Sequence, residues 1–311
     1  MNTIKFSKRE NKTTEQHNLQ ITNIVDSNIF GSHLKMYTPC NLNIFVTESC
    51  QNKCFFCIND KTNKNIHMRP LSDEEYIIGL KKLLNELNCE NFETTITGGE
   101  PTLDIHRFVE TMRICHEHNL KCRTVSTTGL NLMSLYDGKP LCQHMIENNF
   151  VHNINISRMH YDESKNNEIS GGRNITDKDI ERLALFFKLN NAEMRVSCNL
   201  IKGYIDNPDD ILKFIKHYMN LGVETVMFRE LEMCENVRLN NIVESILGLF
   251  EYIETLHGMV YDVDVYSYKD LIVKHYKTLE NINKEITYSL SYKNGIVKDG
   301  FIGNKLNVKL T

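Results

Sequence analysis

Hydrophobic and polar positions alternate along much of the chain in short runs typical of strands, and helical patterns separate these runs. The first such strand covers residues 43–47. Residues 72–75, which begin with Ser72, are a good helix start and lead into a helix over residues 76–87. Five more strands are predicted, at residues 92–97, 121–126, 152–157, 193–200 and 225–229. The helices predicted between them cover residues 105–119, 140–149, 177–190 and 208–221. Such alternation implies parallel pairing and right-handed crossovers, so we expect an α/β fold, either a doubly wound sheet or a partial (β/α)6 TIM-like barrel.

The pattern changes after residue 229. Residues 240–257 predict a long helix, and strand-like stretches follow at residues 260–268, 271–276, 285–292 and 296–310. Lys293-Asn294-Gly295 is a plausible hairpin turn. The first 32 residues are mostly polar, with one short strand at residues 19–25. We therefore expect an N-terminal extension over residues 1–40, a core over 41–235 and an α+β cap with antiparallel strands over 236–311.

Composition and charge narrow the class of protein. With 41% hydrophobic residues in 311, the chain has enough apolar surface for a globular core. The net charge is −4 and charges of both signs are interspersed, so we expect no nonspecific binding to nucleic acid. No stretch approaches the roughly 18 apolar residues of a membrane span, and the N-terminus has no apolar signal segment. These features predict a cytoplasmic protein with no membrane partner.

Three of the ten cysteines, Cys50, Cys54 and Cys57, share one loop directly after the first predicted strand. Three thiolates are enough to hold a [4Fe–4S] cluster by three irons and leave the fourth iron open. Zinc is an alternative, although zinc sites usually add a second cysteine pair or a histidine pair. A disulfide framework is less expected in a chain of this length. The other seven cysteines are scattered singly among apolar residues, which indicates buried thiols and a reducing compartment.

A second motif, residues 97–102 with the sequence Thr-Gly-Gly-Glu-Pro-Thr, follows the next predicted strand. In both architectures considered, ligands bind at the carboxyl ends of the strands, where both motifs fall. Gly98 and Gly99 lack side chains, so backbone groups can approach a ligand, and Glu100 can accept hydrogen bonds from a charged amine. A tight turn would also explain the two glycines on their own.

Together, the two motifs resemble those of the radical S-adenosylmethionine (SAM) superfamily. The family loop is Cys-x3-Cys-x2-Cys with an aromatic residue before the third cysteine, and a Gly-Gly-Glu-Pro turn contacts the methionine end of SAM. The matching residues are Cys50, Cys54, Phe56 and Cys57 in the first motif and Gly98, Gly99, Glu100 and Pro101 in the second. The resemblance implies an enzyme whose core, residues 41–235, binds one [4Fe–4S] cluster through the three cysteines and uses SAM as a cofactor.

The family also places SAM contacts at later strand ends. The resemblance implies that Ser126 and Thr128 line the SAM site and that Ser157 contacts the ribose or carboxylate of SAM. Arg158 is expected to pair with the SAM carboxylate, or else to be a surface arginine. Asn199 matches a polar position that many relatives place against the SAM ribose.

The implied chemistry is reductive cleavage of SAM to methionine and a 5′-deoxyadenosyl radical, which abstracts hydrogen from a substrate. This chemistry would require anaerobic handling and an electron donor of the flavodoxin or ferredoxin type. Candidates for orienting the substrate or transferring a proton are His160, Tyr161, Arg229 and Glu230, all near predicted strand ends. Each of these is also compatible with a surface or ion-paired role.

The spacing of Asn199 before Lys202-Gly203, and residues 226–231, are most similar to the branch that contains the molybdenum cofactor cyclase, whose substrate is a nucleotide. That cyclase has a C-terminal cysteine trio for a second cluster, whereas this chain has no cysteine after Cys234. We therefore do not expect the cyclase activity itself. Peptide-modifying relatives usually add a cysteine-rich C-terminal domain or an N-terminal peptide-recognition module, and neither is visible here, so we expect a small-molecule substrate, with a nucleoside or nucleotide as one option. The reaction would be a rearrangement, a carbon–nitrogen or carbon–carbon cleavage, or a cyclisation. The alternatives are a peptide maturase and a non-catalytic iron–sulfur electron carrier or sensor.

Overall fold

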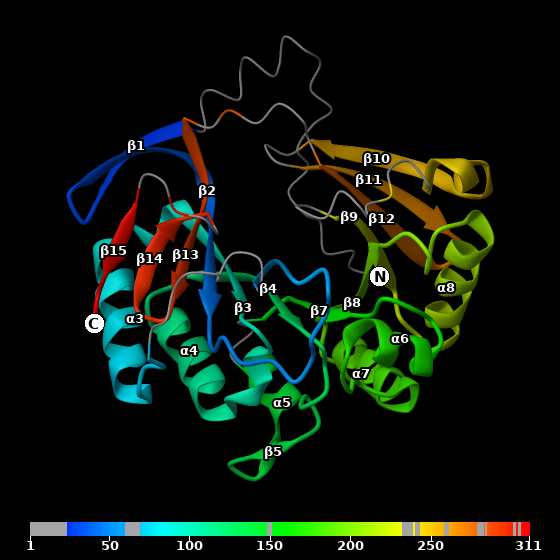
Figure 1. Cartoon of the computed structure of the whole chain (residues 1–311), viewed down its shortest axis with the longest axis horizontal. Coiled ribbons are helices and arrows are strands. Elements are labelled where there is room, and N and C mark those ends of the chain that lie inside the picture. The colour runs from blue at the N-terminus through cyan, green and yellow to red at the C-terminus, as the bar shows by residue number, and fades with distance from the viewer. Residues whose placement is uncertain are drawn as a thin grey trace.

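One curved sheet of thirteen strands runs through the described part of the chain (Figure 1). The computed structural model describes residues 24–59, 69–147, 151–231, 239, 243–257, 261–278, 283, 285–300, 303 and 306–311. The middle of the sheet is parallel and consists of β2 (Ser32–Phe45), β3 (Phe92–Thr97), β4 (Lys121–Thr127), β7 (Asn153–Ser157), β8 (Glu193–Leu200) and β9 (Thr225–Glu230). These strands confirm the predicted α/β fold and partial TIM-like barrel.

Helices cover the outer side of this arch of strands (Figure 1). They are α3 (Asp73–Glu86), α4 (Ile105–Glu117), α5 (Leu141–Ile146), α6 (Glu163–Ser170), α7 (Asp177–Leu189) and α8 (Pro208–Asn220). The predicted start of α3 is confirmed by a capping box, in which the Ser72 hydroxyl accepts from the Glu75 N–H and the Glu75 carboxylate accepts from the Ser72 N–H. Short 3-10 turns occur at Cys89–Asn91, Pro101–Leu103 and Val243–Leu249. None of the described helices is long and apolar enough to cross a membrane.

The strands that follow the core extend the sheet at both flanks instead of forming a separate cap. On one flank, β12 (Leu271–Thr278) pairs in parallel with β9, and β11 (Tyr261–Tyr268) and β10 (Glu251–His257) continue outward as antiparallel strands. On the other flank, β13 (Ile286–Lys293) pairs in parallel with β2, followed by the antiparallel β14 (Ile296–Asp299) and β15 (Asn307–Lys309).

Two smaller hairpins complete the described strands. β1 (Ile24–Ile29) pairs antiparallel with β2, and β5 (Leu135–Tyr136) pairs with β6 (Lys139–Pro140). The hairpin turn predicted at residues 293–295 is present between β13 and β14, where Asn294 and Gly295 both have positive φ angles.

The helix predicted over residues 240–257 is wrong. Residues 240–242 lie outside the described residues, and the rest of the segment forms the 3-10 turn and then β10. Pairing with β11 stabilises the strand, and the Thr255 hydroxyl donates to Asp264 at 2.7 Å across this pair. In the predicted strand at 19–25, residues 19–23 are outside the described part and residues 24 and 25 belong to β1. The domain boundary predicted at residue 40 falls inside β2.

The two faces of the curved sheet differ in polarity. Leu42, Ile96, Ile156, Val196 and Phe228 point outward and are fully buried with the helices. Successive strand residues point to opposite faces, so the residues between them point inward. These inward residues are largely polar and include Asn43, Thr95, Ser126, Asn155, Ser157, Ser197, Asn199 and Arg229. The apolar outer face makes the core, and the polar inner face is left for a ligand.

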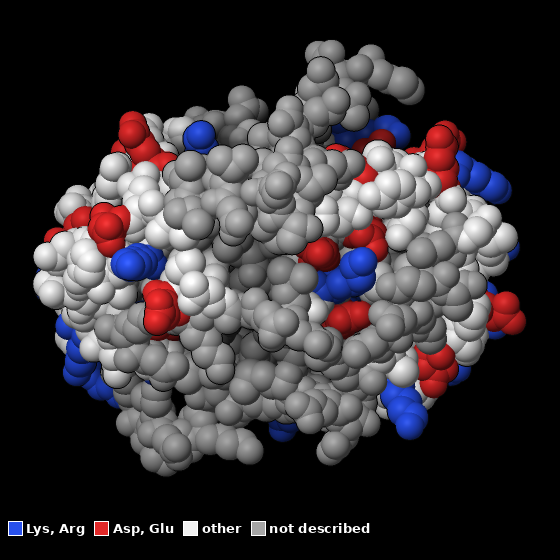
Figure 2. All heavy atoms as spheres, turned by 90° about the horizontal axis from the view of Figure 1, so that it is seen from above, with Lys and Arg blue, Asp and Glu red and all other residues white. Residues whose placement is uncertain are grey.

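The described surface carries charges of both signs. On the face shown in Figure 2, basic and acidic side chains are interspersed over the described residues, without a continuous basic stripe.

Candidate active site

The cysteine loop and the turn at residues 98–100 are joined through their backbones. The Gly99 N–H donates to the Thr47 carbonyl and the Glu100 N–H donates to the Ser49 carbonyl, both at 2.8 Å. A Cβ atom on Gly98 would lie 2.5 Å from the Thr47 carbonyl oxygen, and one on Gly99 would overlap the Ser49 carbonyl. The missing side chains therefore make room for the chain that leads into the cysteine loop, whereas the sequence suggested room for a ligand.

The Glu100 carboxylate is fully buried and is used inside the protein. Its Oε1 accepts from the Thr102 N–H at 3.1 Å, the Thr102 hydroxyl at 2.6 Å and the Thr127 hydroxyl at 2.5 Å. Its Oε2 accepts from the Thr128 N–H at 2.6 Å. Four protein donors thus contact the buried carboxylate, three on Oε1 and one on Oε2, whereas the sequence suggested an acceptor for the amine of a ligand. Glu100 is a positioning residue that ties the turn after β3 to the end of β4, and the buried Pro101 begins the 3-10 turn beside it.

Replacing Glu100 by glutamine is expected to lower the free energy of unfolding by about 1–3 kcal/mol, because the amide group brings a donor to a site lined by donors. Denaturant unfolding of the full-length chain measures this effect. The matched control is Glu90→Gln, since Glu90 is exposed, and its unfolding free energy should change by less than about 0.5 kcal/mol. Equal stability of the two variants would show that Glu100 does not tie the two strand ends together.

The segment after α6 cradles the cysteine loop. The Lys53 N–H donates to the Ser170 carbonyl at 2.8 Å, and Cys54 Sγ lies 3.5 Å from the same oxygen. The Asn52 side chain donates to Asn174 Oδ1 at 3.0 Å. A Cβ atom on Gly172 would lie 2.7 Å from a carbonyl oxygen of the loop. The loop therefore fits on this segment only because residue 172 is glycine.

Sequence reasoning missed α6 and this cradle. The usable signals were at its ends: Asp162 accepts from the Lys165 N–H at 2.9 Å as the N-cap, and Gly171 closes the helix in the left-handed region at φ 62°. Between these caps the helix has one fully buried apolar residue, Ile169, so it shows no hydrophobic period.

Phe56 anchors the loop in a small apolar cluster over the carboxyl ends of β7 to β9. Its neighbours are Met159 after β7, Ile169 on α6, Ile201 after β8 and Leu231 after β9. The adjacent Phe55 is half exposed. The cluster fixes the loop above the inner face, so in this structure Phe56 is packed against protein.

The three loop cysteines are the candidate protein ligands of a [4Fe–4S] cluster. Cys50 is exposed and Cys54 and Cys57 are partly exposed, so all three are accessible from the mouth of the barrel. Among the described residues, no three His, Cys, Asp or Glu side chains converge as one metal ion requires. The thiolates that hold a cluster bind different irons, so they need not converge on one point. Burial raises the pKa of Cys40 and of Cys122 to about 12, which keeps these core thiols protonated and unsuited to metal binding.

The structure brings several predicted SAM contacts to the same end of the barrel. Thr128 accepts from the Gln51 side chain at 2.8 Å, so it contacts the cysteine loop directly. Ser126, Ser157 and Asn199 are partly buried on the inner face, near the carboxyl ends of β4, β7 and β8. These four residues remain candidate ligand contacts.

Arg158 points away from this site, and both roles expected for it are wrong. It follows the inward-facing Ser157, so its side chain enters the outer layer, where it is fully buried. Its guanidinium donates to the Tyr218 hydroxyl at 2.8 Å, the Ile175 carbonyl at 2.7 Å and Asp177 at 3.1 Å. Arg158 therefore joins β7 to α7 and α8 and is neither a SAM ligand nor a surface residue.

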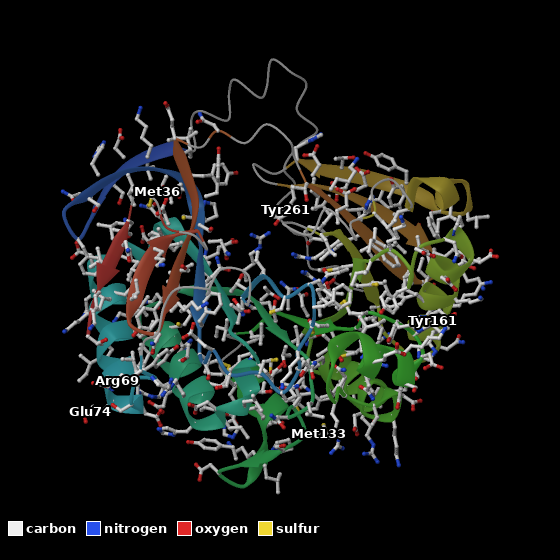
Figure 3. All side chains as sticks on the ribbon, viewed as in Figure 1. Met36, Arg69, Glu74, Met133, Tyr161 and Tyr261 are labelled. Atoms are coloured by element: carbon white, nitrogen blue, oxygen red, sulfur yellow. The ribbon has the colours of Figure 1, made fainter. Side chains whose placement is uncertain are left out.

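Two predicted catalytic residues, His160 and Tyr161, also make their hydrogen bonds with residues of the outer layer. His160 is buried, and its Nδ1 accepts from the Asp162 N–H at 2.9 Å. Burial lowers the pKa of His160 below its usual value. The Tyr161 hydroxyl donates to Asp210 on α8 at 3.2 Å, and Tyr161 lies on the α8 side of the molecule (Figure 3).

Arg229 and Glu230 point to opposite faces of β9. Glu230 Oε1 lies 3.8 Å from His275 Nε2 on the outer side. The guanidinium of Arg229 lies over the ring of Tyr276, 4.5 Å from its centroid. Of the four predicted catalytic residues, only Arg229 therefore faces the inner side of the barrel.

The fold and site define a partial-barrel protein with a three-thiol loop over the carboxyl ends of its parallel strands. The family model described as the radical SAM superfamily matches residues 44–215, and the chain belongs to this superfamily, whose members are enzymes. No curated protein matches the chain significantly.

Several solved structures are similar to part of the chain. SuiB from Streptococcus suis, bound to S-adenosylmethionine, is 20% identical with a TM-score of 0.44, and the match covers 64% of this chain and 40% of SuiB. A domain of pyruvate-formate lyase-activating enzyme from Bacteroides vulgatus is 14% identical with a TM-score of 0.39, covering 50% of this chain and 89% of that domain. The methyltransferase TsrM from Kitasatospora setae, with cobalamin and a [4Fe–4S] cluster bound, is 18% identical with a TM-score of 0.39. The match covers 61% of this chain and 34% of TsrM. The chain thus spans less than half the length of SuiB.

Proposed function

We propose that this chain is a radical SAM enzyme that binds one [4Fe–4S] cluster through Cys50, Cys54 and Cys57 and uses SAM to act on a small molecule. When bound, the cluster and SAM supply reductive carbon–sulfur cleavage to a 5′-deoxyadenosyl radical that abstracts hydrogen. The observation that carries the proposal is the joining of the cysteine loop to the turn at residues 98–100, above a polar inner face.

The chain's own residues would hold and orient the ligands. Ser126, Ser157 and Asn199 offer hydroxyl and amide groups to the ribose and carboxylate of SAM. Thr128 keeps Gln51, and with it the start of the cysteine loop, against the end of β4. The cluster around Phe56 excludes water from one side of the loop.

The small-molecule substrate, with a nucleoside or nucleotide as one option, is favoured by the polar inner face. The reaction we propose is a rearrangement, a carbon–nitrogen or carbon–carbon cleavage, or a cyclisation. An electron donor of the flavodoxin or ferredoxin type would approach where Cys50 and Phe55 are exposed. The buried protonated thiols accord with a reducing compartment such as the cytoplasm.

The test is anaerobic reconstitution of the full chain with iron and sulfide, followed by reduction with dithionite in the presence of SAM. We expect 5′-deoxyadenosine to accumulate in proportion to the loaded cluster, as measured by liquid chromatography. If the protein carries a full complement of cluster and still forms no 5′-deoxyadenosine, the result would contradict the proposed enzymatic activity and favour an electron carrier or sensor.

A further inference from the structure

Three cationic side chains lie on adjacent strands of the inner face. They are Arg195 on β8, Arg229 on β9 and Lys274 on β12. Each alternates with outward core residues of its strand, such as Val196, Phe228 and Val273, which places the three cations on the inner side.

One carboxylate, that of Glu193, serves two of these cations. It pairs with Arg195, lies 3.6 Å from Lys274 Nζ and accepts from the Thr225 hydroxyl at 2.7 Å. Arg229 has no carboxylate within 4.0 Å among the described residues, and its guanidinium lies over Tyr276 instead. Among the described residues, Arg229 is therefore the cation of this group whose charge no nearby carboxylate offsets.

The pKa of Tyr276 reflects the positive charge near it. Burial raises the pKa of Tyr276, but the charges of Arg229, Arg195, Lys274 and Arg123 outweigh this effect and hold the pKa below its usual value. Burial lowers the pKa of Lys274, and the neighbouring Arg195 lowers it further. The shift of the Tyr276 pKa has the sign that nearby positive charge produces and is opposite to the effect of burial.

Aromatic and polar groups surround the same place. Tyr261 lies at the start of β11 (Figure 3), and its ring centroid is 6.3 Å from that of Tyr276. Asn155, two strands away from Arg229, is buried on the inner face, and its Oδ1 has no hydrogen-bond partner among the described residues. This oxygen is an acceptor for which the described protein supplies no donor.

We propose that the substrate is an anionic small molecule whose phosphate or carboxylate group binds Arg229, with Lys274 and Arg195 adding positive charge. This inference rests on the proposed function, because it concerns the substrate of the same barrel. The guanidinium presents paired donors that match either anion. The rings of Tyr276 and Tyr261 offer a flat surface to the part of the substrate beside its anionic group.

The experiment titrates inorganic pyrophosphate and, separately, succinate into the anaerobically reconstituted full chain by calorimetry. The variants are Arg229→Gln and the matched control Arg113→Gln, whose arginine pairs with Glu110 and Glu117 on the exposed side of α4. We expect at least one probe to bind, and to bind about 10- to 100-fold more weakly to Arg229→Gln while the control is unchanged. Stronger binding of pyrophosphate would assign a phosphate, and stronger binding of succinate would assign a carboxylate.

The same titration with SAM separates substrate from cofactor. SAM affinity should be equal in the wild-type chain and in Arg229→Gln, and a loss of SAM affinity would overturn the proposal by assigning Arg229 to the cofactor. Absence of binding by both probes, or equal binding to all three proteins, would also overturn it. These binding measurements need no turnover. A failure to form 5′-deoxyadenosine would therefore contradict the proposed function without bearing on the anion site.

Discussion

Replacing Cys54 by alanine is expected to abolish both the cluster and the cleavage of SAM. Three thiolates are the complete set that this loop offers, and two leave an iron without a protein ligand. Loss of an outer-shell partner alone can cost up to about 100-fold in metal affinity, and loss of a direct ligand should cost more. Iron content, visible absorbance and 5′-deoxyadenosine formation after identical reconstitution measure the effect.

The matched control for this substitution is Cys89→Ala. Cys89 is a partly buried thiol in the 3-10 turn before β3, outside the cysteine loop. Its removal should leave iron content and cleavage at wild-type levels. If Cys54→Ala kept its cluster, or if Cys89→Ala lost it, the ligands would have to lie elsewhere in the chain.

Gly99→Ala is expected to separate the two motifs. The added Cβ atom would overlap the Ser49 carbonyl and lie 2.5 Å from that of Glu48, and backbone atoms cannot move aside as a flexible side chain can. We expect the free energy of unfolding to fall by about 1–3 kcal/mol, as for other overpacked sites. Cluster occupancy should fall as well, because the displaced residues lead directly into Cys50. Denaturant unfolding and iron analysis of the same preparation test both effects.

Gly248→Ala is the control for this steric argument. Gly248 is exposed, and a Cβ atom there would meet no heavy atom within 4 Å. Its stability and iron content should match those of the wild-type chain. The same behaviour from Gly99→Ala would show that the two loops tolerate separation and that their joining does not support the cluster.

The sequence predicted most central strands closely because their pattern is local, with the exception of β2, which begins at Ser32 although the prediction began at residue 43. β3 has the predicted bounds, and its alternation of buried and partly exposed residues is visible in the sequence as Phe-Glu-Thr-Thr-Ile-Thr. The residues of β10 were predicted to be helical. They form a strand because they pair with β11, and such pairing leaves little trace in the sequence of one strand alone. Two of its residues, Tyr252 and Ile253, are exposed, which further weakens the periodic signal.

The sequence predicted which motifs lie at the candidate site, but it predicted less well which way individual side chains point. The spacing of Cys50, Cys54 and Cys57 and the Gly-Gly-Glu turn identified the place. The direction of Arg158 depends on where β7 ends and on Asp177, 19 residues away, which the sequence does not connect to it. Glu100 was expected to accept hydrogen bonds from a charged amine, and in the structure its carboxylate accepts from Thr102, Thr127 and Thr128.

The pairing of β13 with β2 also sets the order in which the protein is completed during synthesis. Asn43 on β2 donates to the Leu290 carbonyl on β13, across 247 residues of chain. β2 can pair with β1 and β3 as soon as these strands are made, but it gains β13, on the edge opposite β3, only after a much longer stretch of chain has been translated. Contacts of such long range form slowly, and an unpaired strand edge invites wrong partners in the meantime. Since the cysteine loop leaves the end of β2, the strand that supports it is fully paired only after β13 has been made.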